Sequence, residues 1–340
     1  MKIKKNAVAI IISLTLVAVI SISACNLSDS MSFDPIILTN GTGEEVSDSM
    51  GFPDDDSTYI SLGMPPLSAS PPIFDTMIPH APGTRVRRNE KSEIDYSNSA
   101  DGYVMIRFLR DTTKQLRVQV TTPAEVTYTY TLKQDRSFET FPLSGGNGDY
   151  LIRVFEQIEG TRYTVANSAT ITVALSDEFA PFLRSNQYVN FLPQSNTVAK
   201  AAELVEGKDK FFDKVSAVYS FVMTHLSYDT NKAKTVQAGY IPVLDKVLEE
   251  GKGICFDYAA LMTAMLRSQG IPTKLVVGYA GTAYHAWINV YSEETGWLDT
   301  VIFFDGEVWT LMDPTFASSG SSAALRFIGD GKNYRAMFLY

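Results

Sequence analysis

Two different hydrophobic patterns divide the chain near residue 178. Between 96 and 177, apolar and polar residues alternate in seven short segments, with turn formers such as those at 145–148 between them: GYVMIRFL, QLRVQV, EVTYTYTL, FETFPL, YLIRVFE, YTVANS and TITVAL. Alternation in β-branched and aromatic segments is typical of strands that bury one face. We therefore expect a β-sandwich domain at 96–177, of which an immunoglobulin-like domain is one form. It either supports the rest of the chain or binds a glycan or protein.

Helical spacing replaces the alternation after residue 178. Apolar residues recur every three or four positions within 208–226, which predicts an amphipathic helix, and 241–249 predicts a second, shorter one. A third helix is predicted at 255–269, where Gly270 ends it. Four segments of strand character follow: TKLVVGY, YHAWINVY, WLDTVIFF and EVWTLMD. Helices followed by an antiparallel sheet predict an α+β domain at 178–340.

The first residues have the anatomy of a secretory signal. A basic start is followed by an apolar stretch over 7–24 and by the sequence Ile-Ser-Ala-Cys, which ends at Cys25. This ending resembles a bacterial lipobox, so we expect a signal peptide at 1–24 and a lipid on Cys25. An uncleaved membrane anchor is the alternative, since the apolar stretch is long enough to span a bilayer. Either reading places the protein at the cell membrane, facing outside the cytoplasm.

A polar segment separates this start from the predicted sandwich. Residues 25–95 are rich in Ser, Asp, Gly and Pro and have no sustained periodicity. Such a composition buries too little apolar surface to offset the entropy of ordering. We expect a disordered tether over 25–95 that carries the folded domains away from the membrane.

The negative net charge of the chain argues against nucleic acid as a partner. The net charge of the 340-residue chain is −9, and removing 1–24 also removes three lysines. An acidic protein without basic runs is a poor ligand for nucleic acid, so none is expected as a partner. The sequence does not indicate an oligomeric state.

Cysteine usage points to chemistry at one position. The chain has two cysteines, and with Cys25 lipidated, Cys255 has no partner for an intramolecular disulfide. Cys255 lies in GKGICFDYAALMTAMLRSQGIP, where a glycine-bearing turn leads into the third predicted helix. Free N–H groups and the positive end of the helix dipole favour a reactive thiolate there. A buried structural cysteine is the alternative, and Asp257 is expected to serve the helix N-terminus.

Thiol catalysis also needs a base and a group that orients it. Of the three histidines, His80 lies in the expected tether, His225 follows the first helix, and His285 lies in a predicted strand. Asp313 ends the last predicted strand, and the proline after it stops that strand. No His or Cys cluster has metal-ligand spacing, so neither a metal nor another cofactor is expected.

Three segments together resemble the motifs of the transglutaminase-like superfamily, which has a papain-type fold. They are GKGICFDYAALMTAMLRSQGIPTKLVVGY, HAWINVY and VWTLMDPTF, and the resemblance covers about 205–316. It implies that Cys255 is the nucleophile, that His285 acts first as base and then as acid, and that Asp313 orients the imidazole. The segment Leu-Ser-Tyr-Asp at 226–229 also resembles this family.

One insertion departs from the family pattern. Extra sequence at 293–307 contains Asp299 and Asp305, and each is an alternative third member of the triad. Asp313 is favoured because the W-x-x-x-D-P-T context accompanies it.

The sequence indicates the oxyanion donors and the walls of the site less clearly than the triad. Beside the N–H of Cys255, the side chains of Tyr228 and Gln237 are candidate oxyanion donors, and Trp287 is either a wall of the site or core. The expected activity is acyl transfer through a Cys255 thioester, most simply hydrolysis of amide bonds in surface protein or wall peptide by a cysteine protease or amidase. The alternatives are a protein-glutamine transglutaminase or deamidase, and a tethered binding protein without activity.

Overall fold

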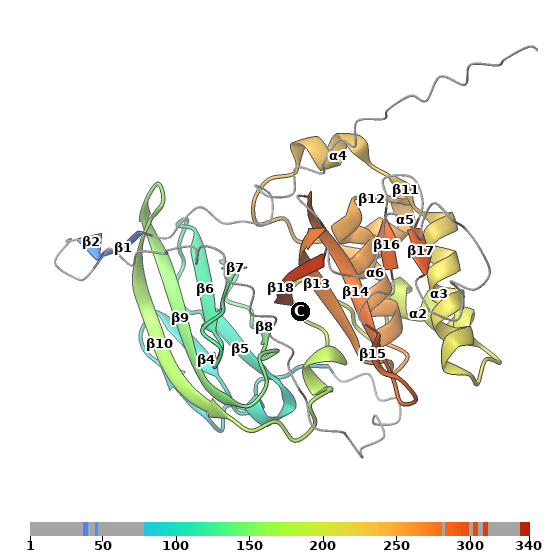
Figure 1. Ribbon diagram of the computed structural model, residues 1–340. Helices are drawn as coiled ribbons and strands as arrows, with labels where there is room; N and C mark the ends of the chain where they lie inside the picture. Colours follow the sequence, from blue (N-terminus) through green and yellow to red (C-terminus); the bar gives the residue numbers. More distant parts are fainter. Residues whose placement is uncertain are drawn as a thin grey trace, which may run out of the picture.

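Two lobes lie side by side in the molecule (Figure 1). The computed structural model describes residues 78–280, 283–298 and 334–340, together with the backbone of four short strands at 37–39, 45–46, 302–304 and 309–311. The first lobe consists of strands, and the second combines helices with an antiparallel sheet. This is the fold class that the sequence predicted.

The first lobe is formed by two sheets. One has the strand order β2(Glu45–Val46), β1(Ile37–Thr39), β10(Arg162–Val173), β9(Gly148–Glu159), β6(Leu116–Thr121) and β7(Thr127–Leu132). The other has the order β3(Val86–Arg88), β4(Ser92–Asp95), β5(Tyr103–Phe108) and β8(Glu139–Pro142). Alternate residues of β7 are buried, as the pattern of tyrosines and threonines indicated. The immunoglobulin-like topology stays a prediction.

The sandwich begins earlier than the expected boundary at 95 and 96. Strands β3 and β4 belong to its second sheet, and β1 and β2 extend the first, so the tether prediction was wrong for 37–39, 45–46 and 86–95. The alternation was hidden because β3 carries two arginines and β4 buries polar side chains. Glu93, for example, is buried and accepts hydrogen bonds of 2.9 and 2.7 Å from the Arg107 guanidinium.

The last two predicted strands of the sandwich are one strand. Strand β10 runs unbroken over twelve residues, with an irregularity in its pairing with β9 between Val165 and Asn167. The side-chain amide of Asn167 donates to the main-chain oxygens of Arg87 and Ser92, at 3.2 and 3.1 Å. Asn167, a buried polar residue of β10, therefore joins the two sheets.

The second lobe places a buried helix against a sheet. Five helices, α2(Asn196–Val205), α3(Phe211–His225), α4(Thr230–Thr235), α5(Leu244–Glu250) and α6(Cys255–Arg267), accompany a sheet with the order β15(Gly296–Leu298), β14(Ala283–Ser292), β13(Thr273–Ala280) and β18(Tyr334–Leu339). Two short pairs, β11(Ser227–Tyr228) with β12(Lys252–Gly253) and β16(Ile302–Phe304) with β17(Trp309–Leu311), and two 3-10 turns, η1(Ser99–Asp101) and η2(Ala180–Phe182), complete the described elements. Every residue of α6 is buried, so this helix forms the centre of the lobe.

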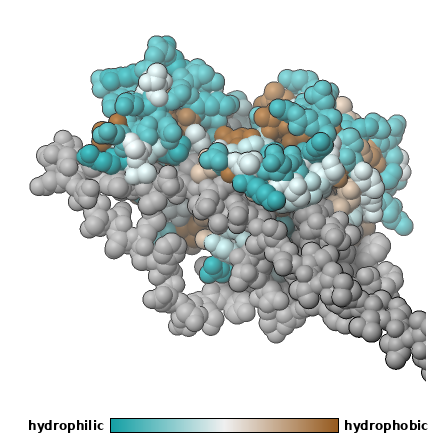
Figure 2. Space-filling model, turned by 90° about the horizontal axis from the view of Figure 1, so that it is seen from above, coloured by the Kyte–Doolittle hydropathy of each residue, from teal (hydrophilic) through white to brown (hydrophobic). Residues whose placement is uncertain are grey.

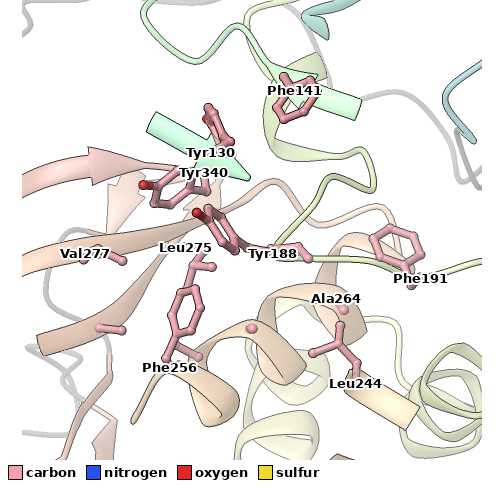
Figure 3. Close-up of a cluster of buried hydrophobic side chains, with 14 of the residues drawn as sticks. Tyr130, Phe141, Tyr188, Phe191, Leu244, Phe256, Ala264, Leu275, Val277 and Tyr340 are labelled. Atoms are coloured by element: carbon pink, nitrogen blue, oxygen red, sulfur yellow. The ribbon is translucent and has the colours of Figure 1, made fainter. Parts of the chain in front are cut away.

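An aromatic cluster joins the two lobes. The ring of Tyr340 lies 4.8 Å from that of Tyr188 and 5.9 Å from that of Tyr130, measured between centroids. Tyr188 in turn packs edge-on against Phe256 of α6 at 5.4 Å (Figure 3). Tyr130 belongs to the sandwich and Phe256 to the second lobe, so one hydrophobic core runs through both.

A buried guanidinium reinforces this junction. Arg267, at the end of α6, donates to the main-chain oxygens of Thr273, Arg184 and Tyr340 at 2.8, 2.7 and 2.5 Å. Burial lowers the pKa of Arg267 to about 9, which still leaves it charged at neutral pH. The three bonds fix the last turn of α6 to its neighbouring segments.

Candidate active site

Cys255 is the first residue of α6, as the sequence predicted. Its side chain is buried, and the helix behind it runs to Arg267. The thiol therefore lies in the first turn, where the main-chain N–H groups have no partner within the helix. The same N–H groups and the helix dipole stabilise a thiolate or an oxyanion at this end.

A buried carboxylate holds the turn before the nucleophile. Asp257 is fully buried, and its Oδ2 accepts hydrogen bonds from the main-chain N–H of Ile254 at 2.8 Å and from Nζ of Lys232 at 2.6 Å. Its Oδ1 accepts from the hydroxyl of Tyr240 at 2.6 Å. Asp257 thus serves the helix N-terminus, as expected, and binds two further segments to it.

The glycine before the nucleophile makes this packing possible. A Cβ atom on Gly253 would lie 2.6 Å from the Cβ of Asp257, closer than real Cβ contacts allow. Only glycine lets the turn approach the helix so closely. Two residues of the GKGICFD segment are therefore explained by the structure. Gly253 is needed because a side chain would not fit there, and Asp257 is needed for its hydrogen bonds.

Lys232 and Tyr240 were missed by sequence reasoning. Lys232 Nζ also donates to the hydroxyl of Tyr240 at 2.6 Å, so the three side chains form a closed set of bonds. Burial and the neighbouring Asp257 raise the pKa of Tyr240, which keeps its hydroxyl a donor. Neither residue lies in a motif, and only the fold brings them to Asp257.

The two candidate oxyanion donors, Tyr228 and Gln237, lie in different segments of the second lobe. Tyr228 is half-buried in β11 and pairs with Gly253, two residues before the nucleophile. Gln237 is exposed in the segment after α4, and its side-chain amide donates to the main-chain oxygen of Thr235 at 2.8 Å. Of the two candidate oxyanion donors, the backbone pairing brings Tyr228 nearer to the start of α6.

Strand β14 carries the candidate base. His285 is buried opposite Gly278 of β13, and the preceding Tyr284 interacts electrostatically with Cys255. The start of β14 therefore lies near the nucleophile. Burial lowers the pKa of His285 to about 4, so at neutral pH the imidazole is uncharged and able to accept a proton.

Trp287 is a buried residue of β14, and its role as a wall of the site stays a prediction. Its ring is nearly parallel to that of His285, with centroids 6.3 Å apart, and it packs edge-on against Tyr334 of β18 at 5.6 Å. The indole and the imidazole therefore lie side by side on one face of β14.

Several predicted site residues lie outside the described residues. These are Asp313, its alternatives Asp299 and Asp305, and the expected lipidation site at Cys25. Within the described ranges, no group of three or more His, Cys, Asp or Glu side chains is arranged to hold a metal. In that same part of the chain, no helix is long and apolar enough to cross a membrane.

We expect Lys232→Met to lower the free energy of unfolding by about 3 kcal/mol, because it leaves the buried Asp257 carboxylate without its cation. Urea denaturation measures this change. Lys246→Met is the matched control, since Lys246 pairs with Glu250 on the surface, and should shift stability by no more than about 0.5 kcal/mol. Equal effects of the two substitutions would contradict the role given to Asp257.

We also expect His285 to make stability depend on pH. Below its ordinary value near 6.5 the unfolded imidazole takes up a proton, whereas the folded one does so only near 4. The unfolded state therefore binds more protons in this window, and the free energy of unfolding falls by up to about 1.4 kcal/mol per pH unit as pH drops from 6.5 to 4. Above pH 6.5 this stability is fully present.

The measurement is urea unfolding at several pH values in this window. His285→Gln should flatten the dependence, and His225→Gln, at an exposed histidine, should keep it. An unchanged slope in His285→Gln would mean that the imidazole is not held neutral by burial.

Comparison with known proteins agrees with the motifs. The family model described as the transglutaminase-like superfamily matches residues 198–301. An uncharacterized protein of Bacillus subtilis (strain 168), YebA, is 29% identical over 143 residues, which is 36% of this chain and 19% of that protein. The chain thus spans about a fifth of the length of this relative.

Two solved structures show partial similarity. A candidate cysteine protease from Cytophaga hutchinsonii has a TM-score of 0.34 and 14% identity, covering 76% of this chain and 74% of that one. A candidate protease from Parabacteroides distasonis ATCC 8503 has a TM-score of 0.25 and 16% identity, covering 52% and 36%. Residues 198–301, which match the family model, contain the motifs at Cys255 and His285, so this part of the chain is a transglutaminase-like domain.

Proposed function

We propose that this protein is a membrane-anchored thiol enzyme that hydrolyses amide bonds in surface protein or wall peptide outside the cytoplasm. The observation that carries the proposal is the position of Cys255 at the start of a buried helix in a transglutaminase-like domain. Asp257 fixes that start, and a neutral His285 follows Tyr284 on the neighbouring strand.

The proposed reaction has two steps. His285 takes the proton of the Cys255 thiol, and the sulfur attacks the carbonyl carbon of the amide. Main-chain N–H groups at the start of α6 donate to the oxyanion that forms. The imidazolium then returns the proton to the leaving amine as the C–N bond breaks, which leaves a thioester on Cys255.

Water completes the cycle. His285 takes a proton from the water as its oxygen attacks the thioester, the carboxylic acid product leaves, and the sulfur regains its proton. We assign to Asp313 the orientation of the imidazole, on the strength of its motif alone. No metal or other cofactor takes part in this scheme.

The location of the enzyme is the second part of the proposal. The signal-like residues 1–24 and the lipobox-like ending at Cys25 support cleavage before Cys25 and lipid attachment to it. A lipid anchor and the polar segment after it would hold the enzyme near its substrates at the cell surface.

The test is hydrolysis of fluorescein-labelled casein by wild type and by Cys255→Ala. We expect release of labelled peptides by wild type, and a loss of at least about a thousandfold in Cys255→Ala because the nucleophile is gone. His225→Gln is a suitable control, since this exposed histidine contacts the main-chain oxygen of Leu248 and the ring of Phe221 within the second lobe.

Adding a labelled primary amine separates the other outcomes. Incorporation of the amine into casein, lost in Cys255→Ala, would replace hydrolysis with transglutaminase activity. Release of ammonia without chain cleavage would identify a deamidase. A protein that cleaves nothing and incorporates nothing, yet binds a surface partner, would be the tethered binding protein that the sequence left open.

A further inference from the structure

Strand β7 lies at the edge of its sheet, and alternate residues direct their main-chain N–H and C=O groups away from the sheet. In an antiparallel pair, the N–H and C=O of one residue face the same side, and the side alternates along the strand. The C=O of Thr131 accepts from Nε2 of Gln187 at 2.7 Å, and the N–H of Lys133 donates to Oε2 of Glu139 at 2.6 Å. Both contacts lie away from β6, so residues 127 and 129 have the same outward orientation.

The middle of this edge is open. Among the described residues, the main-chain N–H and C=O of Thr127 and Thr129 have no hydrogen-bond partner, and both residues are half-buried. Edge strands are commonly blocked by charges or proline. The edge strand β3 carries Arg87 and Arg88, and β8 ends in Pro142, whereas β7 has none of these.

The edge continues into a groove between the two lobes. At its Thr131 end, a cavity of about 700 Å³ lies between the sandwich and the segment after α4. Arg117, Thr131 and Lys133 line one side, and Ala238 and Gly239 the other. Seen from above, the described surface is mostly hydrophilic with smaller hydrophobic patches (Figure 2).

Both walls of the groove are attached to the residues after the nucleophile. On one side, Gly239 is followed by Tyr240, whose hydroxyl binds Asp257. On the other side, Gln187 holds Thr131, and the neighbouring Tyr188 packs on Phe256. Phe256 and Asp257 directly follow Cys255, so both walls of the groove are connected to the first turn of α6.

We propose that a substrate polypeptide in extended conformation adds to the edge of β7 as a further strand and passes through the groove to Cys255. This inference rests on the proposed hydrolase function and names its substrate class. The occupant is an unfolded or extended chain because only a strand presents donors and acceptors at the spacing of Thr127 and Thr129. Recognition through the main chain implies broad sequence tolerance and poor cleavage of folded proteins.

The test removes one main-chain donor from the edge. Proline is tolerated on an edge strand where the N–H faces outward, so Thr129→Pro deletes that donor without breaking the ladder with β6. We expect kcat/KM for fluorescein-labelled casein to fall about tenfold, mainly through KM, while alkylation of Cys255 by iodoacetamide keeps its rate. Thr129→Val is the matched control, because it retains the N–H and removes only the hydroxyl that Nε2 of Gln119 contacts at 3.5 Å, and it should lose much less than Thr129→Pro.

A binding arm separates this inference from the proposed function. Fluorescence anisotropy with Cys255→Ala and the same casein reports binding even if no hydrolysis occurs. Weaker binding when Thr129→Pro is added supports the edge site. An unchanged affinity, or an unchanged kcat/KM in a folded Thr129→Pro protein, overturns it.

If Thr129→Pro does not fold, the wild type takes its place with altered peptides. A hexapeptide that it binds is compared with two N-methylated copies, one methylated on its odd-numbered residues and the other on its even-numbered residues. A loss of affinity of about tenfold in one copy but not in the other supports strand addition, and equal affinities of all three peptides overturn it.

Discussion

The buried carboxylate of Asp257 is the constraint on which the arrangement of the site depends. It gathers the main-chain N–H of Ile254, the ammonium of Lys232 and the hydroxyl of Tyr240. A carboxylate without exposed surface is tolerated only when its charge is paired and its oxygens are bonded. The same bonds therefore fix the turn before Cys255, the helix α4 and the segment that forms one wall of the interlobe groove.

The aromatic cluster between the lobes holds the sandwich in a fixed position relative to α6. Tyr188 lies between the sandwich and α6, and its neighbour Gln187 binds the edge of β7. Because the rings of Tyr130 and Tyr340 share the same core, moving one lobe would expose large apolar surfaces. The first lobe is therefore held against the second, which agrees with a supporting role, and the edge of β7 ends at the groove between the lobes.

Local sequence patterns were enough to predict many of the helices and strands and the position of Cys255 at the start of α6. Helical spacing gave α3 and α6, and alternation gave most strands, since each depends on residues close in sequence. Polar residues buried in β4, such as Glu93, defeated the pattern because their partners come from another strand. Lys232 and Tyr240 were missed for a related reason, as they meet Asp257 over 25 and 17 residues. The place of Asp313 stays a prediction.

We propose Cys255 as a nucleophile that is assisted by His285. The most direct measurement is the rate of alkylation by iodoacetamide between pH 5 and 8, followed on the peptide that contains Cys255. We predict a rate that reaches its plateau well below pH 8.5, the midpoint of an ordinary thiol, and that falls at least about tenfold in His285→Gln. A rate that rises through pH 8 as for a free thiol, and is unchanged in His285→Gln, would contradict it.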